Sequence, residues 1–513
     1  MPTVSPDALL AALERHWGSR EFRPRQREII EAVLQGRDVA VVMPTGAGKS
    51  LCYQMPALFL AGTAVVVSPL IALMKDQVER LNQSGIRAAA LNSATPPAEQ
   101  RQILREARQG AVRLLYIAPE RLLREDTIEL LKQIPVCYYA IDEAHCISEW
   151  GHEFRPDYRR LHELRALRPQ APILALTASA TSRVRHDILR QLGMRDPLKF
   201  IRSFERPNLR YLAGKTDARG QWRLLQAALA AHAGSSVIVY ASTIALVEQT
   251  ARKLNEVGVG AVAYHAQMPP EERRAAQDRW MEGKPSVLAG TIAFGMGIDK
   301  PDVRAVIHLS LPKSLEQYYQ EAGRAGRDGL PSDCALLWQP RDIGVLVYFL
   351  KQIGDPAERQ RAWRRYDDIR GYAESALCRH IVICRHFGEP VPSRICGMCD
   401  LCGSVPEWFA RAQAPATAPV RRDRPSPTPP AAPAPEAPSP APEQALYEKL
   451  RAWRLEVARS EQKPAYVVFH DSVLRSIAST RPADLEALSG ISGLGPRKLE
   501  KYGPEVLRLL QSA

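Results

Sequence analysis

The sequence predicts an α/β fold with two parallel-sheet domains, followed by a helical region and a small all-α domain. Short apolar runs alternate with amphipathic stretches from Asp38 onward, and this pattern pauses near residues 204–211 before it starts again. Such alternation is typical of parallel sheets covered by helices on both faces. The strand-like runs stop after Pro340, and only helical patterns follow.

Five apolar runs are the predicted strands of the first domain, and five more are those of the second. Helical stretches such as Ile244–Val257 and Pro270–Met281 separate them. We therefore expect two α/β domains joined near residue 205. The runs of the first domain are Val39–Met43, Ala64–Val67, Arg113–Ile117, Val136–Ile141 and Ile173–Leu176, and those of the second are Ser236–Tyr240, Gly260–Tyr264, Ser286–Gly290, Val303–Leu309 and Asp333–Trp338.

The region after the two sheets is divided by a proline-rich segment. Residues 414–442 contain 11 of the chain's 41 prolines, together with alanine and serine. A segment of this composition cannot bury enough apolar surface to offset its ordering entropy, so we expect an extended, semi-rigid tether. Residues 445–510 then show a helical pattern with turn residues between its parts, which predicts a small independent module.

Length, charge and cysteine usage limit the class of protein. The 513 residues correspond to about three domains. The 69 Lys and Arg residues exceed the 56 Asp and Glu residues, and the net charge of +13 favours a polyanionic partner. Residues 1–18 lack a signal-peptide pattern, and no apolar stretch is long enough to span a membrane. Clustered cysteines favour metal binding over disulfides, so we expect a reducing, cytoplasmic location and no membrane partner.

A phosphate-binding loop is predicted at residues 43–50, Met-Pro-Thr-Gly-Ala-Gly-Lys-Ser, which follow an apolar strand and open a helix. Its glycines let backbone N–H groups converge on phosphates, the lysine adds a positive charge, and the serine hydroxyl can ligate Mg²⁺. The loop lacks the first glycine of the Walker A pattern, so a glycine-rich turn with a solvated lysine is the alternative. The predicted nucleotide-binding residues are Thr45, Gly46, Ala47, Gly48, Lys49 and Ser50.

A carboxylate pair follows another predicted strand, at Asp142 and Glu143 in the sequence Asp-Glu-Ala-His. An acidic residue in this place can hold Mg²⁺, and its neighbour can orient or deprotonate an attacking water molecule. We assign these roles to Asp142 and Glu143 respectively. A helix N-cap is the alternative for an isolated Asp-Glu pair.

Two arginines, Arg324 and Arg327, lie at the end of a predicted helix in the second domain, in the run Gln-Glu-Ala-Gly-Arg-Ala-Gly-Arg-Asp-Gly at residues 320–329. Guanidinium groups that face a γ-phosphate stabilise the charge that develops as the phosphoryl group leaves. The alternative is a solvated arginine-rich helix end that the helix dipole stabilises.

Four cysteines offer the thiolates of a tetrahedral zinc site. Three of them have x-x spacing in a glycine-containing loop, and one lies farther upstream. Four thiolates are a common ligand set for structural Zn²⁺, whereas reduced core thiols rarely cluster in this way. The predicted ligands are Cys378, Cys396, Cys399 and Cys402.

An aromatic-rich segment, residues 147–156, follows the Asp-Glu-Ala-His sequence. Trp150 and Phe154 offer stacking faces for bases, and His152 and Arg155 can meet phosphate. A segment so close to the carboxylate pair can report bound nucleic acid to it. The alternative is that Trp150 and Phe154, four residues apart, form a helix-packing pair.

Together these motifs resemble superfamily 2 helicases, and the segments around them resemble the RecQ family of DNA helicases. Residues 22–26, Phe-Arg-Pro-Arg-Gln, match the family motif whose glutamine recognises adenine, which implies that Gln26 binds the base and Arg23 assists. Residues 68–77 and 118–121 resemble its strand-contacting motifs, 177–181 the motif that couples hydrolysis to movement, and 293–301 and 320–329 its late motifs. The resemblance also implies that Arg327 is the principal arginine finger, that Arg324 is its companion, and that residues 147–156 sense single-stranded DNA.

The C-terminal module resembles the helicase-and-RNase-D C-terminal (HRDC) domain, through residues 450–454, 464–469 and 488–498. Its Gly-Leu-Gly turn can present N–H groups to a DNA phosphate beside Lys498, or it can be purely structural. The resemblance implies RecA-like domains at 1–204 and 205–340, a zinc module at 341–406, a linker at 407–442 and an HRDC domain at 443–513.

The sequence departs from the family at two places. The 39 residues from Gly403 to Ala441 leave no room for the winged-helix domain that most members carry, so this domain is expected to be absent. Ser19 stands where many members have an aromatic residue that stacks on adenine, and Arg23 or Trp17 can compensate.

The resemblance implies an ATP-dependent 3′-to-5′ DNA helicase of repair or recombination, with ATP, Mg²⁺ and Zn²⁺ as cofactors. It implies single-stranded and tailed or forked duplex DNA as substrates, single-stranded-DNA-binding and recombination proteins as partners, and a location at the bacterial nucleoid. The missing winged helix leaves one enzymatic alternative: a DNA-stimulated ATPase that translocates, remodels or anneals DNA with little unwinding. The motifs favour neither a binding scaffold without hydrolysis nor an RNA helicase.

Overall fold

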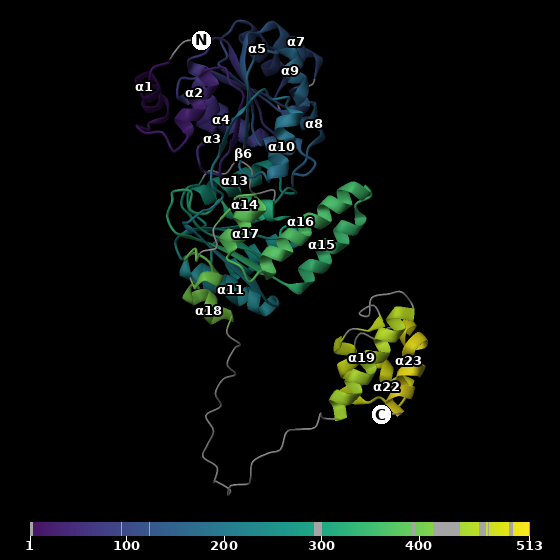
Figure 1. Cartoon of the computed structure of the whole chain (residues 1–513). Coiled ribbons are helices and arrows are strands. Elements are labelled where there is room, and N and C mark those ends of the chain that lie inside the picture. The colour runs from purple at the N-terminus through teal and green to yellow at the C-terminus, as the bar shows by residue number, and fades with distance from the viewer. Residues whose placement is uncertain are drawn as a thin grey trace. The chain divides into compact units, whose positions relative to one another are not determined.

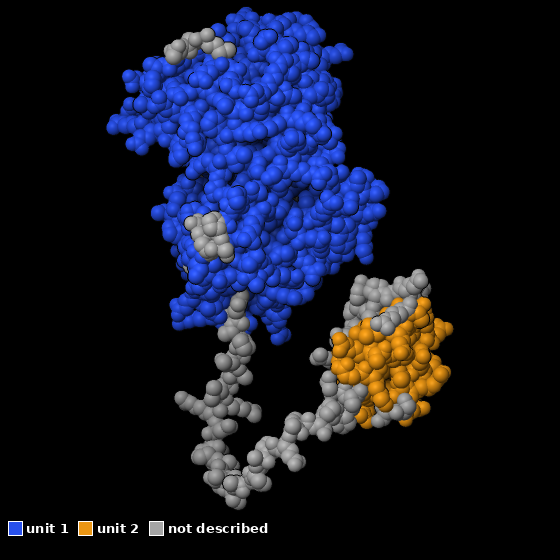
Figure 2. Space-filling model, viewed as in Figure 1, with its two compact units in different colours: residues 1–418 blue, residues 419–513 orange. Residues whose placement is uncertain are grey.

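The computed structural model of the chain contains two compact units, residues 1–418 and 419–513 (Figure 1, Figure 2). Each unit has its own hydrophobic core. The residues that the structure describes are 4–93, 95–122, 124–291, 300–391, 395–403, 405–413, 442–460, 468–469, 471–491 and 496–511.

A seven-stranded parallel sheet forms the centre of the first domain, with the strand order β3-β4-β2-β5-β6-β1-β7. Alternate residues of one strand enter two different cores: Val65 and Val67 pack into one, and Ala64 and Val66 into the other. Both faces of the sheet are therefore buried, as the continuous apolar runs predict. The strands are β1 (Val39–Val42), β2 (Thr63–Val67), β3 (Ala88–Leu91), β4 (Leu114–Ile117), β5 (Val136–Ile141), β6 (Ile173–Thr177) and β7 (Leu198–Ile201).

Helices connect these strands and cover the sheet (Figure 1). Several begin at side-chain caps: Ser5 accepts a hydrogen bond at the start of the first helix, and Thr181 does so at the start of the tenth. The helices are α1 (Pro6–Trp17), α2 (Gln26–Leu34), α3 (Lys49–Gln54), α4 (Ile71–Gln83), α5 (Pro97–Arg108), α6 (Pro119–Leu122), α7 (Glu125–Gln133), α8 (Pro156–Arg159), α9 (Glu163–Leu167) and α10 (Ser182–Gln191), with short 3₁₀ turns at Met55–Leu58, Ala144–Ile147 and Arg160–His162.

The second domain contains a six-stranded parallel sheet with the order β10-β11-β9-β12-β13-β8. Its strands also bury both faces, since Ile238 packs into the core shared with the first domain and Val237 into a separate one. The elements are β8 (Leu209–Lys215), α11 (Ala218–Ala231), β9 (Ser236–Tyr240), α12 (Ile244–Glu256), β10 (Ala261–Tyr264), α13 (Pro270–Met281), β11 (Val287–Gly290), β12 (Val303–His308), α14 (Leu315–Ala322) and β13 (Ser332–Trp338).

A helical region follows the second sheet and packs against it. The helices α15 (Pro340–Gln352) and α16 (Pro356–Glu374) form an antiparallel pair, and α17 (Arg379–His386) leads to a cysteine-containing 3₁₀ turn at Asp400–Cys402 (Figure 1). This turn attaches to β8, because the backbone N–H of Tyr211 donates to Met398 O at 3.2 Å and that of Ala213 donates to Asp400 Oδ2 at 3.1 Å.

The linker does not begin at residue 407 as predicted, because residues 407–413 form the helix α18 (Glu407–Gln413). Phe409 is only 2% exposed and packs into the core of the second sheet, and the Trp408 indole donates to Asp333 Oδ2 at 3.1 Å. These two aromatic side chains hold the helix in place. The predicted tether at 414–442 lies outside the described residues except for its last one.

In the residues that the structure describes, the second unit contains helices and no strands. Its helices are α19 (Pro442–Ser460), α21 (Asp471–Thr480), α22 (Leu485–Ser489) and α23 (Pro496–Gln511), and they share one core around Leu450, Phe469 and Leu474. Within the described part of the chain, no helix has the length and apolar character needed to cross a membrane.

The predicted α/β class is confirmed, but the sequence did not reveal three of the strands. The strand β3 is Ala-Ala-Ala-Leu, and alanine has low strand propensity. The strand β7 is half-exposed at the edge of its sheet, and β8 starts where the apolar pattern pauses. Pairing with neighbouring strands, rather than local composition, makes these segments strands.

Candidate active site

The predicted phosphate loop joins β1 to α3, and two glycines give it its shape. Gly46 and Gly48 have φ angles of +82° and +81°, a region that favours glycine. A Cβ atom at Gly46 would also lie only 3.1 Å from Cγ of Arg327. Glycine at this position therefore permits both the turn and the close approach of an arginine from the second domain.

Lys49 is the first residue of α3, and its side chain turns back over the loop. Its Nζ donates to the carbonyl oxygen of Met43 at 3.2 Å. Burial lowers the pKa of Lys49, while the nearby carboxylates of Glu143 and Asp142 act in the opposite direction. A buried ammonium group beside these carboxylates suits the binding of a phosphate together with its metal ion, because solvent screens the positive charge only weakly there.

Asp142 and Glu143 directly follow β5, at the carboxyl edge of the sheet. Asp142 is 6% exposed, and burial together with the charge of Glu143 raises its pKa to about 7. Its Oδ1 accepts a hydrogen bond from the backbone N–H of Glu143 at 3.0 Å, and Glu143 has a φ of +46°. The turn thus directs both carboxylates toward the phosphate loop.

Behind this pair lies the buried ring of His145. Its Nδ1 is 2.9 Å from Oγ1 of Thr177 and 3.3 Å from Oε2 of Glu143. Its ring stacks on that of His152, with centroids 4.8 Å apart and an interplanar angle of 5°. His145 therefore connects the carboxylate pair with residues 177–181 and with the aromatic-rich segment.

Arg324 and Arg327 follow the end of α14 in the second domain, and they lie near the phosphate loop and the carboxylate pair of the first domain. The two domains touch nearby, where Gln320 Nε2 donates to Ser179 Oγ at 2.9 Å. A cavity of about 470 Å³ lies between the domains, with a size that suits a small-molecule ligand. Its lining includes Lys49, Ser50, Asp142, Glu143, Arg324 and Arg327.

The predicted adenine-binding residues lie against the phosphate loop. Gln26 is 3% exposed; its Nε2 donates to Gly48 O at 2.9 Å, and its Oε1 accepts from the backbone N–H of Arg23 at 2.8 Å. The Arg23 guanidinium donates to Gly46 O and lines the cavity, whereas Trp17 packs among apolar side chains of the α1 region. Thr45 and Gly48 line the cavity as well, whereas Ala47 of the same loop is buried in the apolar core.

The aromatic-rich segment is half-buried at Trp150, His152, Phe154 and Arg155, and these predicted contact residues have different partners. The Trp150 ring contacts two guanidinium groups, of Arg183 and Arg361. Arg155 donates to the carbonyl oxygen of Pro69 at 3.3 Å, within the predicted strand-contacting motif at 68–77, and the Phe154 ring centroid lies 5.7 Å from the Arg159 guanidinium. Trp150 and Phe154 are not a helix-packing pair, because residues 148–155 lie between the 3₁₀ turn Ala144–Ile147 and α8 and are not helical.

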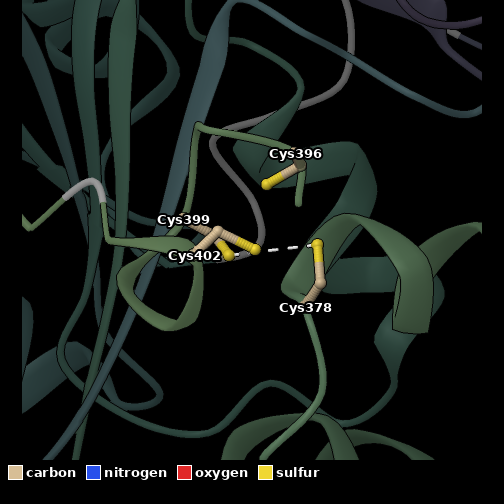
Figure 3. Close-up of side chains that lie close together, drawn as sticks. All are labelled: Cys378, Cys396, Cys399 and Cys402. Atoms are coloured by element: carbon tan, nitrogen blue, oxygen red, sulfur yellow. Dashed lines mark hydrogen bonds between the residues drawn. The ribbon is translucent and has the colours of Figure 1, made fainter. Parts of the chain in front are cut away.

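The four predicted zinc ligands come together at one point. The Sγ atoms of Cys378, Cys396, Cys399 and Cys402 all lie within 4.8 Å of one another, and those of Cys378 and Cys399 are 4.0 Å apart. Figure 3 shows the side chains directed toward a common centre. Tetrahedral Zn–S bonds of about 2.3 Å require sulfur atoms a little under 4 Å apart, so the donor set fits Zn²⁺. Cys384 is buried elsewhere, in the apolar core.

In the second unit, Lys498 lies on α23 with its Nζ 5.8 Å from the Phe469 ring. The predicted Gly-Leu-Gly turn at 493–495 lies outside the described residues, as do residues 464–467. The late motif at 293–301 lies outside them too, apart from its last two residues.

These domains and this cavity define a class, the two-domain helicases. Comparison with protein-family models matches residues 23–188 to the DEAD/DEAH box helicase domain and residues 220–329 to the helicase conserved C-terminal domain. Residues 340–403 match the RecQ zinc-binding domain, and residues 443–510 match the HRDC domain.

Curated relatives narrow the class further. The ATP-dependent DNA helicase RecQ of Pasteurella multocida is 34% identical over 98% of this chain and 93% of the relative, and that of Bacillus subtilis is 33% identical over 98% of both. The Haemophilus influenzae RecQ is 43% identical over 79% of this chain, which spans 65% of that relative's length. The chain belongs to the RecQ family of ATP-dependent DNA helicases.

The alignment with the Pasteurella relative extends over 593 positions, although this chain has 513 residues. At least 80 of those positions therefore have no counterpart here. The zinc-binding and HRDC matches are separated only by residues 404–442. A winged-helix domain of the expected size does not fit between them.

Solved structures show the same fold. The crystal structure of the DUF1998 helicase MrfA bound to DNA and AMPPNP has a TM-score of 0.55 at 21% identity, covering 69% of this chain and 53% of that one. Mss116p bound to single-stranded RNA and AMP-PNP has a TM-score of 0.55 at 16% identity, covering 75% and 90%. At these identities the likeness shows the fold alone.

Sequence reasoning missed several residues that complete the site. Glu153 and Gln320 line the cavity, and both lie inside the segments that resemble family motifs, so their position in the chain was a usable clue. Arg183, Arg361 and Arg365 contact the aromatic-rich segment from distant helices. No local pattern marks these three arginines.

Proposed function

We propose that the chain is a 3′-to-5′ DNA helicase that couples ATP hydrolysis to translocation on single-stranded DNA and to duplex unwinding in repair and recombination. The observation that carries the proposal is the cavity between the domains. It places Lys49, Asp142 and Glu143 of one domain opposite Arg324 and Arg327 of the other. The curated RecQ relatives support unwinding rather than remodelling alone.

In this proposal the phosphate loop binds the triphosphate. Backbone N–H groups of Thr45 to Gly48 and the Lys49 ammonium contact the phosphates. Ser50 and Asp142 would hold Mg²⁺, which neutralises phosphate charge when bound. Gln26 has a further N–H and a further lone pair for an adenine edge, beside Arg23.

Hydrolysis then depends on one carboxylate and two arginines. Glu143 orients the attacking water and accepts its proton, and Arg327, assisted by Arg324, stabilises the charge on the leaving phosphoryl group. Because the arginines belong to the second domain, ATP favours contact between the domains and hydrolysis weakens it. This cycle would drive movement along a strand.

We further propose that Trp150, His152, Phe154 and Arg155 contact single-stranded DNA, and that Lys498 contributes a phosphate contact from the HRDC domain. Cys378, Cys396, Cys399 and Cys402 would hold structural Zn²⁺. The division at residues 204, 340 and 442 remains a proposal, with the start of the linker moved from 407 to 414, after α18.

Tailed and forked duplexes are the proposed substrates, and single-stranded-DNA-binding and recombination proteins are the proposed partners. Both follow from the proposed activity, because unwinding exposes single strands that such proteins bind. A helicase that acts on the chromosome would work in the cytoplasm, at the nucleoid.

Replacement of Lys49 by alanine tests the function. It should lower ATP hydrolysis with single-stranded DNA by about 100-fold or more, because the phosphates lose a buried positive charge. Strand displacement of a 3′-tailed duplex should fall equally, whereas Lys351→Ala, at the exposed end of α15, should leave both rates unchanged. Unwinding by the Lys49 variant, or preference of the unmodified chain for a 5′ tail, would contradict the proposal.

A further inference from the structure

The zinc module contacts the aromatic-rich segment directly, through two arginines of α16. Arg361 Nη1 is 3.4 Å from Glu149 Oε2, and its guanidinium carbon is 5.7 Å from the Trp150 ring centroid. Arg365 Nη1 donates to the carbonyl oxygen of Gly151 at 3.4 Å. Three successive residues of the segment thus face one helix that lies some two hundred residues later in the chain.

A single carboxylate organises both arginines. Glu358, one turn earlier on α16, accepts from Arg361 Nε at 2.9 Å through one oxygen and from Arg365 Nη2 at 2.5 Å through the other. The two arginine side chains are only 13% and 16% exposed. Partly buried guanidinium groups held in this way lose little freedom when they bind, unlike solvated surface pairs.

The segment has a second attachment at His152, directly after these three residues. There the His152 ring stacks on His145, which lies beside Glu143 in the hydrolysis site. The Trp150 ring is also covered by Arg183 of α10, whose guanidinium carbon lies 3.0 Å from the ring centroid. A base that stacks on this face of Trp150 has to displace that guanidinium, and the segment must adjust.

We propose that Arg361 and Arg365 are positioning residues that anchor the aromatic-rich segment to the zinc module, so that its response to single-stranded DNA is transmitted to the hydrolysis site. This inference rests on the proposed function. When α16 fixes residues 149–151, the adjustment caused by a stacked base occurs at His152 and reaches His145. Without these two arginines, residues 149–151 are free to move, and the adjustment occurs there instead of at His152.

The test compares ATP hydrolysis with and without single-stranded DNA. In Arg361→Ala and Arg365→Ala, hydrolysis at saturating DNA should fall about tenfold, within the range usual for coupling between sites, while basal hydrolysis stays unchanged. Arg361→Lys should recover part of the loss, because it keeps a charge opposite Glu149. Arg370→Ala is the matched control: it lies on the same helix, exposed, and pairs with Glu374 at 3.0 Å.

A second measurement does not depend on activity. Amide hydrogen exchange at residues 148–155 should be faster in the double variant Arg361→Ala/Arg365→Ala and unchanged in Arg370→Ala. Equal loss of basal and stimulated hydrolysis, or unchanged stimulation with unchanged exchange, would overturn the inference. If the unmodified chain hydrolyses no ATP, the proposed function fails, whereas the exchange data still show whether the arginines hold the segment.

Discussion

At Gly46 the phosphate loop of the first domain lies close to Arg327 of the second domain. Its φ of +82° is unfavourable for any side chain, and an added Cβ would press on the aliphatic part of Arg327. In the proposed mechanism, the phosphate loop therefore accommodates the arginine of the second domain as well as the phosphates. A Cβ atom at residue 46 would therefore disturb both the conformation of the loop and the placement of Arg327.

Arg327→Ala is predicted to abolish most of the hydrolysis without preventing nucleotide binding. An arginine finger contributes about 10³-fold or more to the rate because it stabilises charge that appears only in the transition state. Single-turnover hydrolysis and binding of a fluorescent ATP analogue measure the two effects separately. Arg279→Ala, an exposed arginine on α13, is the control. A variant that binds nucleotide poorly but still hydrolyses it would show that Arg327 acts in binding.

At the scale of elements, the cysteine cluster holds the start of α17, the 3₁₀ turn and β8 together. Arg379, the first residue of α17, pairs with Asp400 at 3.0 Å, and Asp400 also accepts the backbone N–H of Ala213 in β8. The ion pair is almost fully buried, so it is stable only while both partners stay in place. Metal binding and the Arg379–Asp400 ion pair therefore stabilise the same contact between α17, the 3₁₀ turn and β8.

Cys399→Ser is predicted to lose the metal and to loosen the zinc module. Three thiolates bind Zn²⁺ far more weakly than four, and a structural zinc site contributes its binding free energy to folding. Zinc content should fall below one ion per chain, and the thermal unfolding midpoint should drop. Cys137→Ser, at a half-buried position of β5, should keep full zinc content. Full zinc content in the Cys399 variant would show that this thiol is not a ligand.

At the scale of the whole molecule, the chain consists of a large unit that carries all the predicted catalytic residues and a separate helical unit. The core of the large unit is continuous through both sheets and the zinc module. The second unit has a core of its own. Removal of the second unit should therefore leave the fold of the first intact.

A chain that ends at Ala418 is predicted to keep ATP hydrolysis stimulated by single-stranded DNA and an unchanged melting midpoint. A chain that ends at Val405 loses α18 and the burial of Phe409, which is worth about 3 kcal/mol, and should melt roughly 5 °C lower. Differential scanning calorimetry and ATPase assays on both chains check this. Loss of stimulation in the 418-residue chain would assign the coupling to the HRDC domain.

The sequence by itself determined the chemical groups of this protein. The phosphate loop, the Asp142–Glu143 pair, the arginine pair and three of the four cysteines are each defined within a few residues, because local spacing fixes how neighbouring side chains are presented. The fourth cysteine, Cys378, lies farther upstream. The two-sheet class was also predictable, since runs buried on both faces are continuously apolar.

Only the tertiary structure decided which of these groups meet and what supports them. The contact of Arg327 with Gly46, the hold of Arg361 and Arg365 on the aromatic-rich segment, and the packing of α18 join parts that lie far apart in the chain. No periodicity or motif distinguishes an arginine that contacts a distant segment from an arginine on the solvent-exposed surface. Such pairings arise because sheets and helices bury their apolar faces together, and the polar contacts are fixed by that packing.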